Sequence, residues 1–386
     1  MLLSAIISLS RGVCHCLDNN RFIREFAMKW CYVKYIFSGL VIIIAGCSIK
    51  PTDRGQQYKD GYLDQALKHV KKPNIKGELL NIQDYLNEVL EIKCAAPLIF
   101  DRYNKTYQLV KNWLLAGADM RQLKEYGLSA EQMRGIDNYG NVQFTGYYTP
   151  VLQVRYPKQG NFRYPLYRMP EQDKKTLPSR ASIYSGALDD CYIIAYSNSL
   201  IDNFMMEVQG SGYVDYGNGQ PLVLFSYGGK NGYAYHSIAR VLVDRGAIAS
   251  TAISMQGVYQ WAANHSATEL RELLEQNPSF VFFRPEPFTT VKGASVVSLI
   301  AKASVASDFS IIPAGTTLLV EAPLLNNKGK FIGEYETRLM ISLDVGGAIK
   351  GQHIDIYEGI GLAAGQLAGY YNHYGRVWLL SSSGVL

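Results

Sequence analysis

The chain has 386 residues, of which 48% are hydrophobic and 18% charged, and this globular composition excludes a disordered, collagen-like or multi-span membrane protein. The formal net charge is only +5, so the chain lacks the dense basic surface of nucleic-acid-binding domains and we expect no nucleic-acid partner. The 35 glycines and 28 tyrosines indicate many turns and aromatic-rich strands, and hence a mainly β protein with some helices.

Residues 1–46 have the features of a secretory leader. Lys29 and Lys34 accompany an uncharged apolar run, residues 35–46, which is shorter than the roughly 20 residues that cross a bilayer. The run ends at Cys47 after Ala45 and Gly46, and this ending resembles the lipobox of bacterial lipoproteins. The resemblance implies removal of residues 1–46 and lipidation of Cys47, whereas the alternative is a plain signal peptide followed by a chance cysteine.

Residues 47–75 are polar and are predicted to form a lipidated tether. Position 48 is Ser rather than Asp, which by analogy with lipoprotein sorting implies an outer-membrane anchor facing the periplasm. Met28 is a second possible start of translation, because the stretch before it is unusually long for a signal peptide.

Two cysteines besides Cys47 remain after the leader is removed. Cys94 and Cys191 either pair in an oxidising compartment or stay as two buried thiols. The spacing favours neither alternative.

Helical periodicity occurs in four segments. The apolar spacing predicts helices over residues 81–93, 103–115, 237–247 and 266–276. In the last of these, Ser266 and Glu269 have the spacing of a capping box, and Pro278 ends the pattern.

Strands dominate the rest of the chain. Half of the tyrosines lie between Tyr139 and Tyr235, which indicates a β unit in the middle of the sequence. From Phe280 onwards we expect β structure to the C-terminus, with strands near residues 281–284, 316–321, 339–344, 353–357 and 376–380.

Motifs for nucleotide, serine-nucleophile and metal chemistry are missing from the sequence. Residues 210–212 (GSG) begin like a dinucleotide loop, but position 215 is Asp and no helix pattern follows. The sequence contains neither a Gly-x-Ser-x-Gly nor a His-Glu-x-x-His motif. We therefore expect no metal and no cofactor.

Acidic residues are the remaining candidates for chemistry. Asp308, Asp344 and Asp355 each lie beside apolar residues near predicted strands. Alternation along residues 353–357 (HIDIY) places His353, Asp355 and Tyr357 on one face and two isoleucines on the other, in the core. Apolar surroundings favour a raised pKa and hence a general acid. The alternative is that these aspartates only cap turns.

Three sequence blocks carry a resemblance to a known family. Residues 144–150 (FTGYYTP), 208–212 (VQGSG) and 344–357 (DVGGAIKGQHIDIY) together resemble the membrane-bound lytic murein transglycosylase A (MltA) family. The last block also resembles the three-aspartate (3D) domain of other cell-wall proteins, which is named for residues that match Asp308, Asp344 and Asp355.

The resemblance implies a fold. Residues 76–150 and 290–386 would form a double-psi β-barrel domain that carries the aspartates. Residues 151–289 would form a second, inserted β-barrel domain, with a groove for a glycan strand between the two.

The resemblance also implies a reaction, namely cleavage of the β-1,4 bond between N-acetylmuramic acid and N-acetylglucosamine without water, leaving a 1,6-anhydro end. This is a lyase reaction, of the lytic exotransglycosylase type. Asp355 would act first as general acid and then as base, Asp344 would hold the sugar or Asp355 in position, and Asp308 would support this network.

The resemblance also implies contacts with the substrate. Thr145, Tyr147, Gln209 and Ser211 are the expected residues of the glycan groove, although tyrosines more commonly pack within strands. The implied partners are peptidoglycan glycan strands, the outer membrane through the lipid anchor, and complexes of cell-wall synthesis or hydrolysis.

Two other functions stay open from the sequence. The protein is alternatively a lysozyme-like hydrolase of the same glycan that uses a water activated by Asp344. The second alternative is a non-catalytic wall-binding lipoprotein, although acidic residues at all three matching positions argue against it.

Overall fold

The computed structural model describes residues 66–383 apart from residues 76–77, 135–141, 172–176, 250–253 and 288. The predicted leader, Cys47 and residues 48–65 of the predicted tether lie outside the described residues. The tether prediction is wrong for Leu67–Val70, which form a strand paired with Leu128–Met133. Within the part that is described, no helix is both long and apolar enough to cross a membrane.

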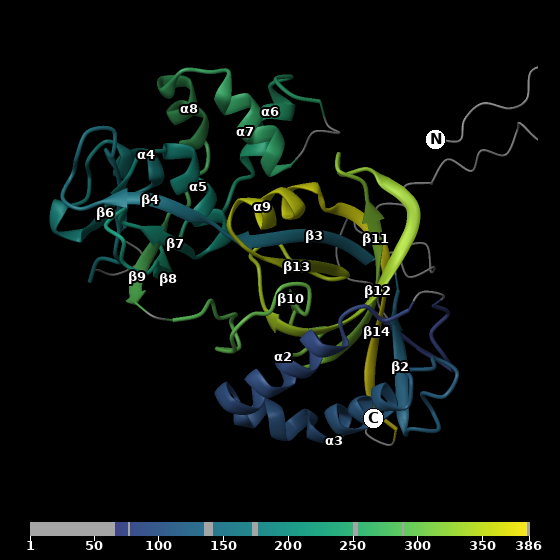
Figure 1. Cartoon of the computed structure of the whole chain (residues 1–386). Helices are drawn as coiled ribbons and strands as arrows, with labels where there is room; N and C mark the ends of the chain where they lie inside the picture. Colours follow the sequence, from purple (N-terminus) through teal and green to yellow (C-terminus); the bar gives the residue numbers. More distant parts are fainter. Residues whose placement is uncertain are drawn as a thin grey trace, which may run out of the picture. The chain divides into compact units, whose positions relative to one another are not determined.

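The larger of two sheets has eight strands in the order β1-β2-β14-β11-β12-β10-β13-β3 (Figure 1). Strand β3 also pairs with β14. The strand pairs therefore form a closed circuit of six strands, β14-β11-β12-β10-β13-β3. The strands are β1 (Leu67–Val70), β2 (Leu128–Met133), β3 (Val142–Thr149), β10 (Ser304–Ala306), β11 (Thr317–Leu325), β12 (Phe331–Asp344), β13 (His353–Ile360) and β14 (Asn372–Ser382).

One face of this sheet forms an apolar core. Ile354 and Ile356 of β13 are buried there with Phe144 of β3, as the alternation of β13 predicted. Residues two apart in a strand share a face, whereas neighbours point to opposite faces. The next residues along, Thr145 on β3 and Asp355 on β13, therefore lie on the face away from this core.

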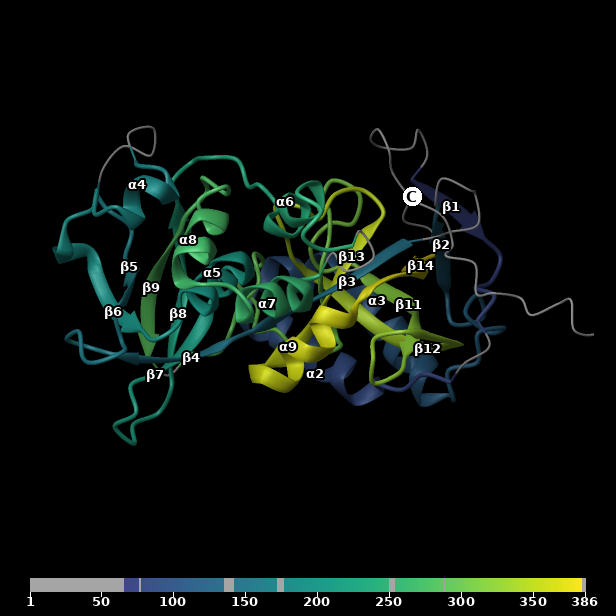
Figure 2. The same ribbon diagram turned by 90° about the horizontal axis from the view of Figure 1, so that it is seen from above.

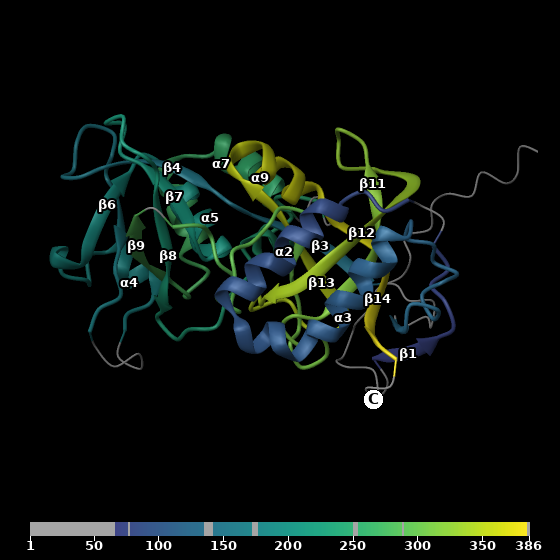
Figure 3. The same cartoon turned by 60° about the horizontal axis from the view of Figure 1, so that its bottom comes forward.

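Two helices cover the other side of the larger sheet. Helices α2 (Ile82–Ala95) and α3 (Pro97–Leu115) pack against each other and against β12 and β14 (Figure 3). They share a second core with the sheet, in which Trp113 and Trp378 are fully or almost fully buried.

The smaller sheet has six strands in the order β5-β6-β4-β7-β8-β9 (Figure 2). Its strands are β4 (Val151–Arg155), β5 (Tyr164–Tyr167), β6 (Ile193–Ser197), β7 (Gly212–Asp215), β8 (Val223–Lys230) and β9 (Val281–Pro287). The helices of this region are α4 (Arg180–Tyr184), η2 (Asp190–Tyr192), α5 (Leu200–Gln209), α6 (Ile238–Asp244), α7 (Met255–Ala263) and α8 (Ala267–Leu274).

The predicted helices are present, with shifted ends. Helix α8 has the predicted capping box, in which the Ser266 and Glu269 side chains each bond the other's backbone N–H. Helix α3 begins at Pro97 rather than at residue 103, because proline is well suited to the first turn of a helix.

The prediction of β structure from Phe280 to the C-terminus is wrong at one place. Residues Gly361–Tyr370 form helix α9. This segment (GLAAGQLAGY) contains no charged residue, so it has no polar stripe by which a helix is recognised in a sequence. The sequence patterns also did not predict helices α4, α5 and α7.

Neither prediction for the two cysteines is correct. Cys94 and Cys191 are free, and both are exposed rather than buried. Cys94 lies near the end of α2. Cys191 lies in η2, where its backbone N–H bonds the Asp189 carboxylate.

Helix α9 packs directly on the strand that carries Thr145 and Tyr147 (Figure 2). The residue between them is Gly146, and a Cβ atom placed there would lie 2.7 Å from the Cα of Ala368 in α9. Any larger residue would therefore push α9 away from β3. The glycine of the TGY sequence allows the helix to support the strand from behind.

Candidate active site

Strands β3 and β13 bring Thr145 and Asp355 together. The two strands are parallel, and Thr145 is the register partner of Asp355. The Thr145 hydroxyl donates a hydrogen bond of 2.6 Å to Oδ1 of Asp355. This contact joins residues 210 positions apart in the chain.

Tyr147 holds a second carboxylate on the same face. It lies two residues after Thr145, and its hydroxyl donates to Oδ2 of Asp344 at 3.1 Å. Strand β10 lies between the two aspartates, since Ala306 pairs with both Asp344 and Asp355. Two strand spacings of roughly 4.8 Å therefore separate their backbones.

The Asp355 carboxyl has the proton affinity of an acid that works near neutrality. Burial raises its pKa to about 7, the negative charges of Asp344 and Glu358 act in the same direction, and the Thr145 bond opposes them. The residue is nevertheless partly exposed to solvent. The carboxyl is thus accessible to a ligand and exists in both protonation states near pH 7.

Asp344 is surrounded by hydrogen-bond donors. Its Oδ1 accepts from the backbone N–H groups of Ala294 at 2.8 Å and Val345 at 2.9 Å, and its Oδ2 accepts from Tyr147. Burial raises the pKa of Asp344, and these three bonds oppose that effect because they stabilise the carboxylate.

Asp308 anchors a loop and is buried. One of its oxygens accepts from the backbone N–H and the hydroxyl of Ser310, and the other accepts from the N–H of Gly351 at 3.0 Å. Gly351 lies just before β13. The carboxylate thereby ties the turn after β10 to the loop that leads to Asp355.

Two residues of the site were not assigned a role from the sequence. Nε2 of His353 lies 2.8 Å from the Thr145 hydroxyl oxygen. Tyr357 bonds the Thr149 hydroxyl at 2.9 Å, and its ring lies 5.2 Å from that of Tyr147. Alternation had placed His353 and Tyr357 beside Asp355, but only the pairing with β3 shows what they contact.

Gln209 and Ser211 lie at the end of helix α5 and just after it. Gln209 ends α5, where its Oε1 accepts from the backbone N–H of Tyr148 at 2.9 Å and its Nε2 lies 3.2 Å from the sulfur of Met255. Ser211 follows Gly210 in the link between α5 and β7. Among the described residues, no hydrogen bond joins either side chain to Asp344 or Asp355.

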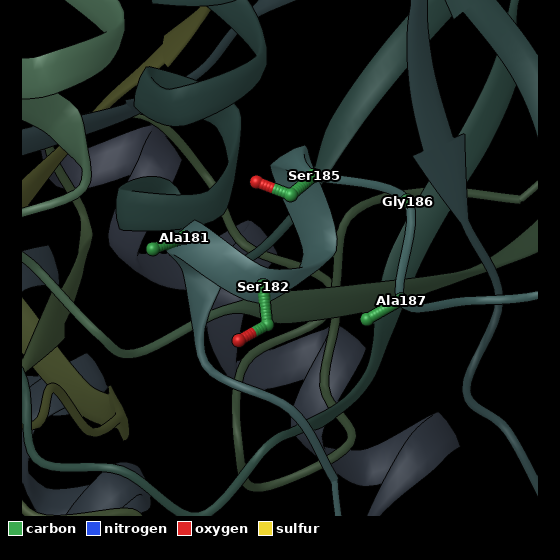
Figure 4. A pocket seen from close by; sticks show the side chains of 5 residues that line it. All are labelled: Ala181, Ser182, Ser185, Gly186 and Ala187. Carbon is green, nitrogen blue, oxygen red and sulfur yellow. The ribbon is translucent and has the colours of Figure 1, made fainter.

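A surface hollow beside α4 provides no alternative site (Figure 4). Its lining residues are small and carry no ionisable side chain: Ala181, Ser182, Ser185, Gly186 and Ala187. The Ser185 hydroxyl already accepts from Arg271 at 3.0 Å, and the Ser182 hydroxyl lies 3.2 Å from that of Ser179. Across the described parts of the chain, no cluster of three or more His, Cys, Asp or Glu residues is arranged to hold a metal.

Comparison with known proteins gives consistent matches over most of the chain. Residues 143–284 match the model of the MltA specific insert domain, and residues 303–381 match that of the 3D domain. Membrane-bound lytic murein transglycosylase A of Escherichia coli K12 is 58% identical over 357 residues, which is 92% of this chain and 98% of that protein. The homolog from Buchnera aphidicola is 43% identical over 94% of this chain and 99% of its own length.

The solved structures agree with the sequence matches. The crystal structure of Escherichia coli MltA with bound chitohexaose covers 86% of this chain and 99% of that chain, with 58% identity and a TM-score of 0.81. This likeness extends over both sheets and includes the mainly β fold with helices. The chain therefore belongs to the membrane-bound lytic murein transglycosylase A family.

Proposed function

We propose that the protein cleaves the β-1,4 bond between N-acetylmuramic acid and N-acetylglucosamine in peptidoglycan and leaves a 1,6-anhydro end. Family membership supports the substrate and the reaction class. The observation that carries the mechanism is the contrast between the two carboxyl groups, because Asp355 has a pKa of about 7 whereas Asp344 accepts three hydrogen bonds.

Asp355 supplies both proton transfers. Its neutral form donates a proton to the glycosidic oxygen as the bond to the anomeric carbon breaks. The resulting carboxylate then takes the proton of the sugar's own C6 hydroxyl as that oxygen bonds to the anomeric carbon. Ordinary glycosidases need a second carboxylate as base or nucleophile. Here the C6 hydroxyl is the nucleophile, so one carboxyl near its pKa is sufficient.

Asp344 acts by position and charge. As a base for water it would need a lone pair directed at that water, but three of its roughly four lone-pair sites already accept hydrogen bonds. Its negative charge raises the pKa of Asp355. These contacts favour the transglycosylase over a hydrolase that uses Asp344 as base.

The remaining predicted site residues have supporting roles in this proposal. The Thr145 and Tyr147 hydroxyls orient the two carboxyl groups, and Asp308 fixes the loop before β13. Gln209 connects α5 to the end of β3 through the Tyr148 amide. Ser211 retains the predicted role of a glycan contact.

We also propose the domain organisation that the family resemblance implies. Residues 76–150 and 290–386 form a six-stranded double-psi β-barrel, and the closed circuit of strand pairs through β3 and β14 supports it. Residues 151–289 form the inserted β-barrel domain, which contains all six strands of the smaller sheet. The glycan strand binds in a groove between them.

The proposed location is the periplasmic face of the outer membrane. Relatives named as membrane-bound support membrane association, and the lipobox-like sequence before Cys47 supports a lipid anchor. Peptidoglycan strands are the proposed substrate, and complexes of cell-wall synthesis or hydrolysis are the proposed protein partners.

Conservative variants of the two aspartates test the assignment of roles. Asp355→Asn keeps the shape but removes the proton, so clearing of a sacculus suspension should fall by at least the roughly 10²- to 10⁴-fold that one positioned acid or base contributes. Asp344→Asn should reduce the rate less, because its oxygen can still accept backbone hydrogen bonds. Glycan binding, measured by co-sedimentation with sacculi, should survive in both variants.

The opposite ranking would contradict the assignment. A fully active Asp355→Asn variant, or an Asp344→Asn variant that is the more impaired of the two, would transfer the acid–base role to Asp344. A wild-type protein that binds sacculi without clearing them would indicate a non-catalytic wall-binding lipoprotein.

A further inference from the structure

The Thr145 hydroxyl lies between two groups that compete for its single proton. Its oxygen is 2.6 Å from Oδ1 of Asp355 and 2.8 Å from Nε2 of His353. A hydroxyl donates one hydrogen bond and accepts up to two. The direction of both bonds is therefore determined by which neighbour carries a proton of its own.

The surroundings of His353 determine which ring nitrogen carries hydrogen. A hydrogen bond with the backbone of Ala348 favours the protonated ring, so the partner is the carbonyl, because an amide N–H would favour the neutral ring. Nε2 faces Thr145, and the N–H directed at the carbonyl is therefore Nδ1–H.

The His353 ring is neutral at physiological pH. Burial lowers its pKa to about 4, and a neutral ring that carries its hydrogen on Nδ1 has a lone pair on Nε2. Nε2 is then an acceptor that needs the Thr145 proton.

With these assignments, one acceptor lacks a hydrogen bond from Thr145 whenever Asp355 is ionised. Oδ1 of the carboxylate and Nε2 of His353 both accept, and Thr145 has one proton for the two of them. Protonation of Asp355 removes the conflict, because the carboxyl then donates to Thr145 and Thr145 donates to His353. In that state every donor and acceptor is satisfied in the row formed by Asp355, Thr145 and His353.

We propose that His353 is a positioning residue that acts through the Thr145 hydroxyl to keep Asp355 protonated until the glycosidic bond breaks. The inference rests on the proposed function of Asp355 as general acid. For the transfer, the carboxyl O–H turns from Thr145 to the glycosidic oxygen, its O–H bond breaks as the proton passes to that oxygen, and the Thr145 hydroxyl turns from Nε2 to Oδ1. The proton from the C6 hydroxyl then restores the first arrangement, so the cycle consumes no proton.

Other ionisable groups act on Asp355 but lie outside this row. Asp344 at the end of β12, Glu358 on β13 and Tyr147 on β3 interact with it electrostatically, and the residue paired with it on β10 is the uncharged Ala306. Substitutions of Thr145 or His353 leave all of these groups in place. A change in the pH profile of such variants therefore reports on the row itself.

Two substitutions should shift the pH profile in opposite directions. With soluble glycan strands as substrate, kcat/KM of the wild type should fall with rising pH as Asp355 loses its proton. His353→Phe removes the competing acceptor, so the Thr145 hydroxyl donates to the Asp355 carboxylate alone. The fall of kcat/KM with pH, the alkaline limb of the profile, should then move to lower pH by about one unit, which is a tenfold loss of proton affinity. Thr145→Val removes the bond that favours the carboxylate, so the limb should move to higher pH.

The double variant and two controls identify the path of the effect. Because His353 acts through Thr145, the variant with both substitutions should match Thr145→Val, and Thr145→Ser should retain the wild-type profile. His373, whose Nε2 bonds the Gly329 carbonyl at 3.0 Å, provides the matched control, and His373→Phe should leave the limb in place. A purely structural role would lower kcat without these opposed shifts.

A measurement on the unaltered protein keeps the inference testable if a variant fails to fold. Nitrogen-15 NMR of histidine-labelled protein should show His353 neutral at pH 7 with its hydrogen on Nδ1. Hydrogen on Nε2 would overturn the role proposed for His353 and leave the proposed function intact. The same conclusion would follow if the alkaline limbs of the variants coincided while Asp355→Asn is inactive. Activity of Asp355→Asn would instead overturn the proposed function itself.

Discussion

At the scale of single residues, the site shows how two identical side chains acquire different properties from their surroundings. Asp344 and Asp355 are both drawn out of water, and burial raises the pKa of each. Asp344 gains three donors that stabilise its charge, whereas the Thr145 hydroxyl bonded to Asp355 also lies within reach of His353. In the proposed mechanism, this difference in environment separates a positioning carboxylate from a carboxyl that is ready to donate a proton.

The raised pKa of Asp355 also predicts a cost in stability. The folded protein binds this proton more tightly than the unfolded chain, in which the pKa is near 3.9. Stability therefore falls as pH rises from about 4 to about 7, and the penalty is complete above pH 7. Asp355→Asn removes the charge and should increase the free energy of unfolding at pH 8.5 by up to a few kcal/mol, with little change near pH 4.

Urea unfolding of the wild type and the variant at the two pH values measures this difference. Asp344→Asn is the matched comparison and should show a smaller gain at pH 8.5, because burial raises the pKa of Asp344 as well but three hydrogen bonds that stabilise its carboxylate oppose this effect. An Asp355→Asn variant that is no more stable than the wild type at pH 8.5 would mean that the Asp355 carboxyl ionises freely in the folded protein.

At the scale of elements, β13 was predictable and its partner strand was not. Alternation in HIDIY correctly separated the buried isoleucines from Asp355, because residues two apart in a strand share a face. The pairing of β13 with β3 joins segments far apart in the chain, and no local pattern encodes it. The contacts of Asp355 with Thr145, and of Thr145 with His353, therefore emerged only from the structure.

The missed helices have a related physical cause. Helix α9 is uncharged and packs on β3 through the space left by Gly146, so tertiary contact rather than an amphipathic pattern accounts for it. Helix α5 does have local signals, namely a Ser199 N-cap that accepts from the Asp202 N–H and a left-handed Gly210 at its end. The sequence prediction assigned Gly210 to a dinucleotide-like loop and to the VQGSG block, and not to the end of a helix.

At the scale of the whole molecule, the chain combines a sheet that carries the aspartates with a second sheet inserted between β3 and β10. The strands that supply Thr145, Tyr147, Asp344 and Asp355 all belong to the larger sheet. We therefore expect chemistry to depend on that sheet and substrate selection to depend also on the inserted one.

The proposed anchor predicts where the whole protein is found. Cys47→Ala removes the acylation site but no part of the two sheets, so the variant should appear in the soluble periplasmic fraction and should still clear purified sacculi. Membrane fractionation followed by the turbidity assay measures both properties. A Cys47→Ala variant that stays firmly in the outer membrane would exclude a single lipid anchor at this cysteine.

Mass analysis of the products from purified murein tests the central claim most directly. If the C6 hydroxyl is the nucleophile and Asp355 is both acid and base, each new muramic acid end is a 1,6-anhydro sugar, one water lighter than the hydrolysis product and without a reducing end. Products formed in ¹⁸O-labelled water should contain no label at that end. Free reducing ends that carry the label would show that water is the nucleophile and would contradict the single-aspartate transglycosylase mechanism.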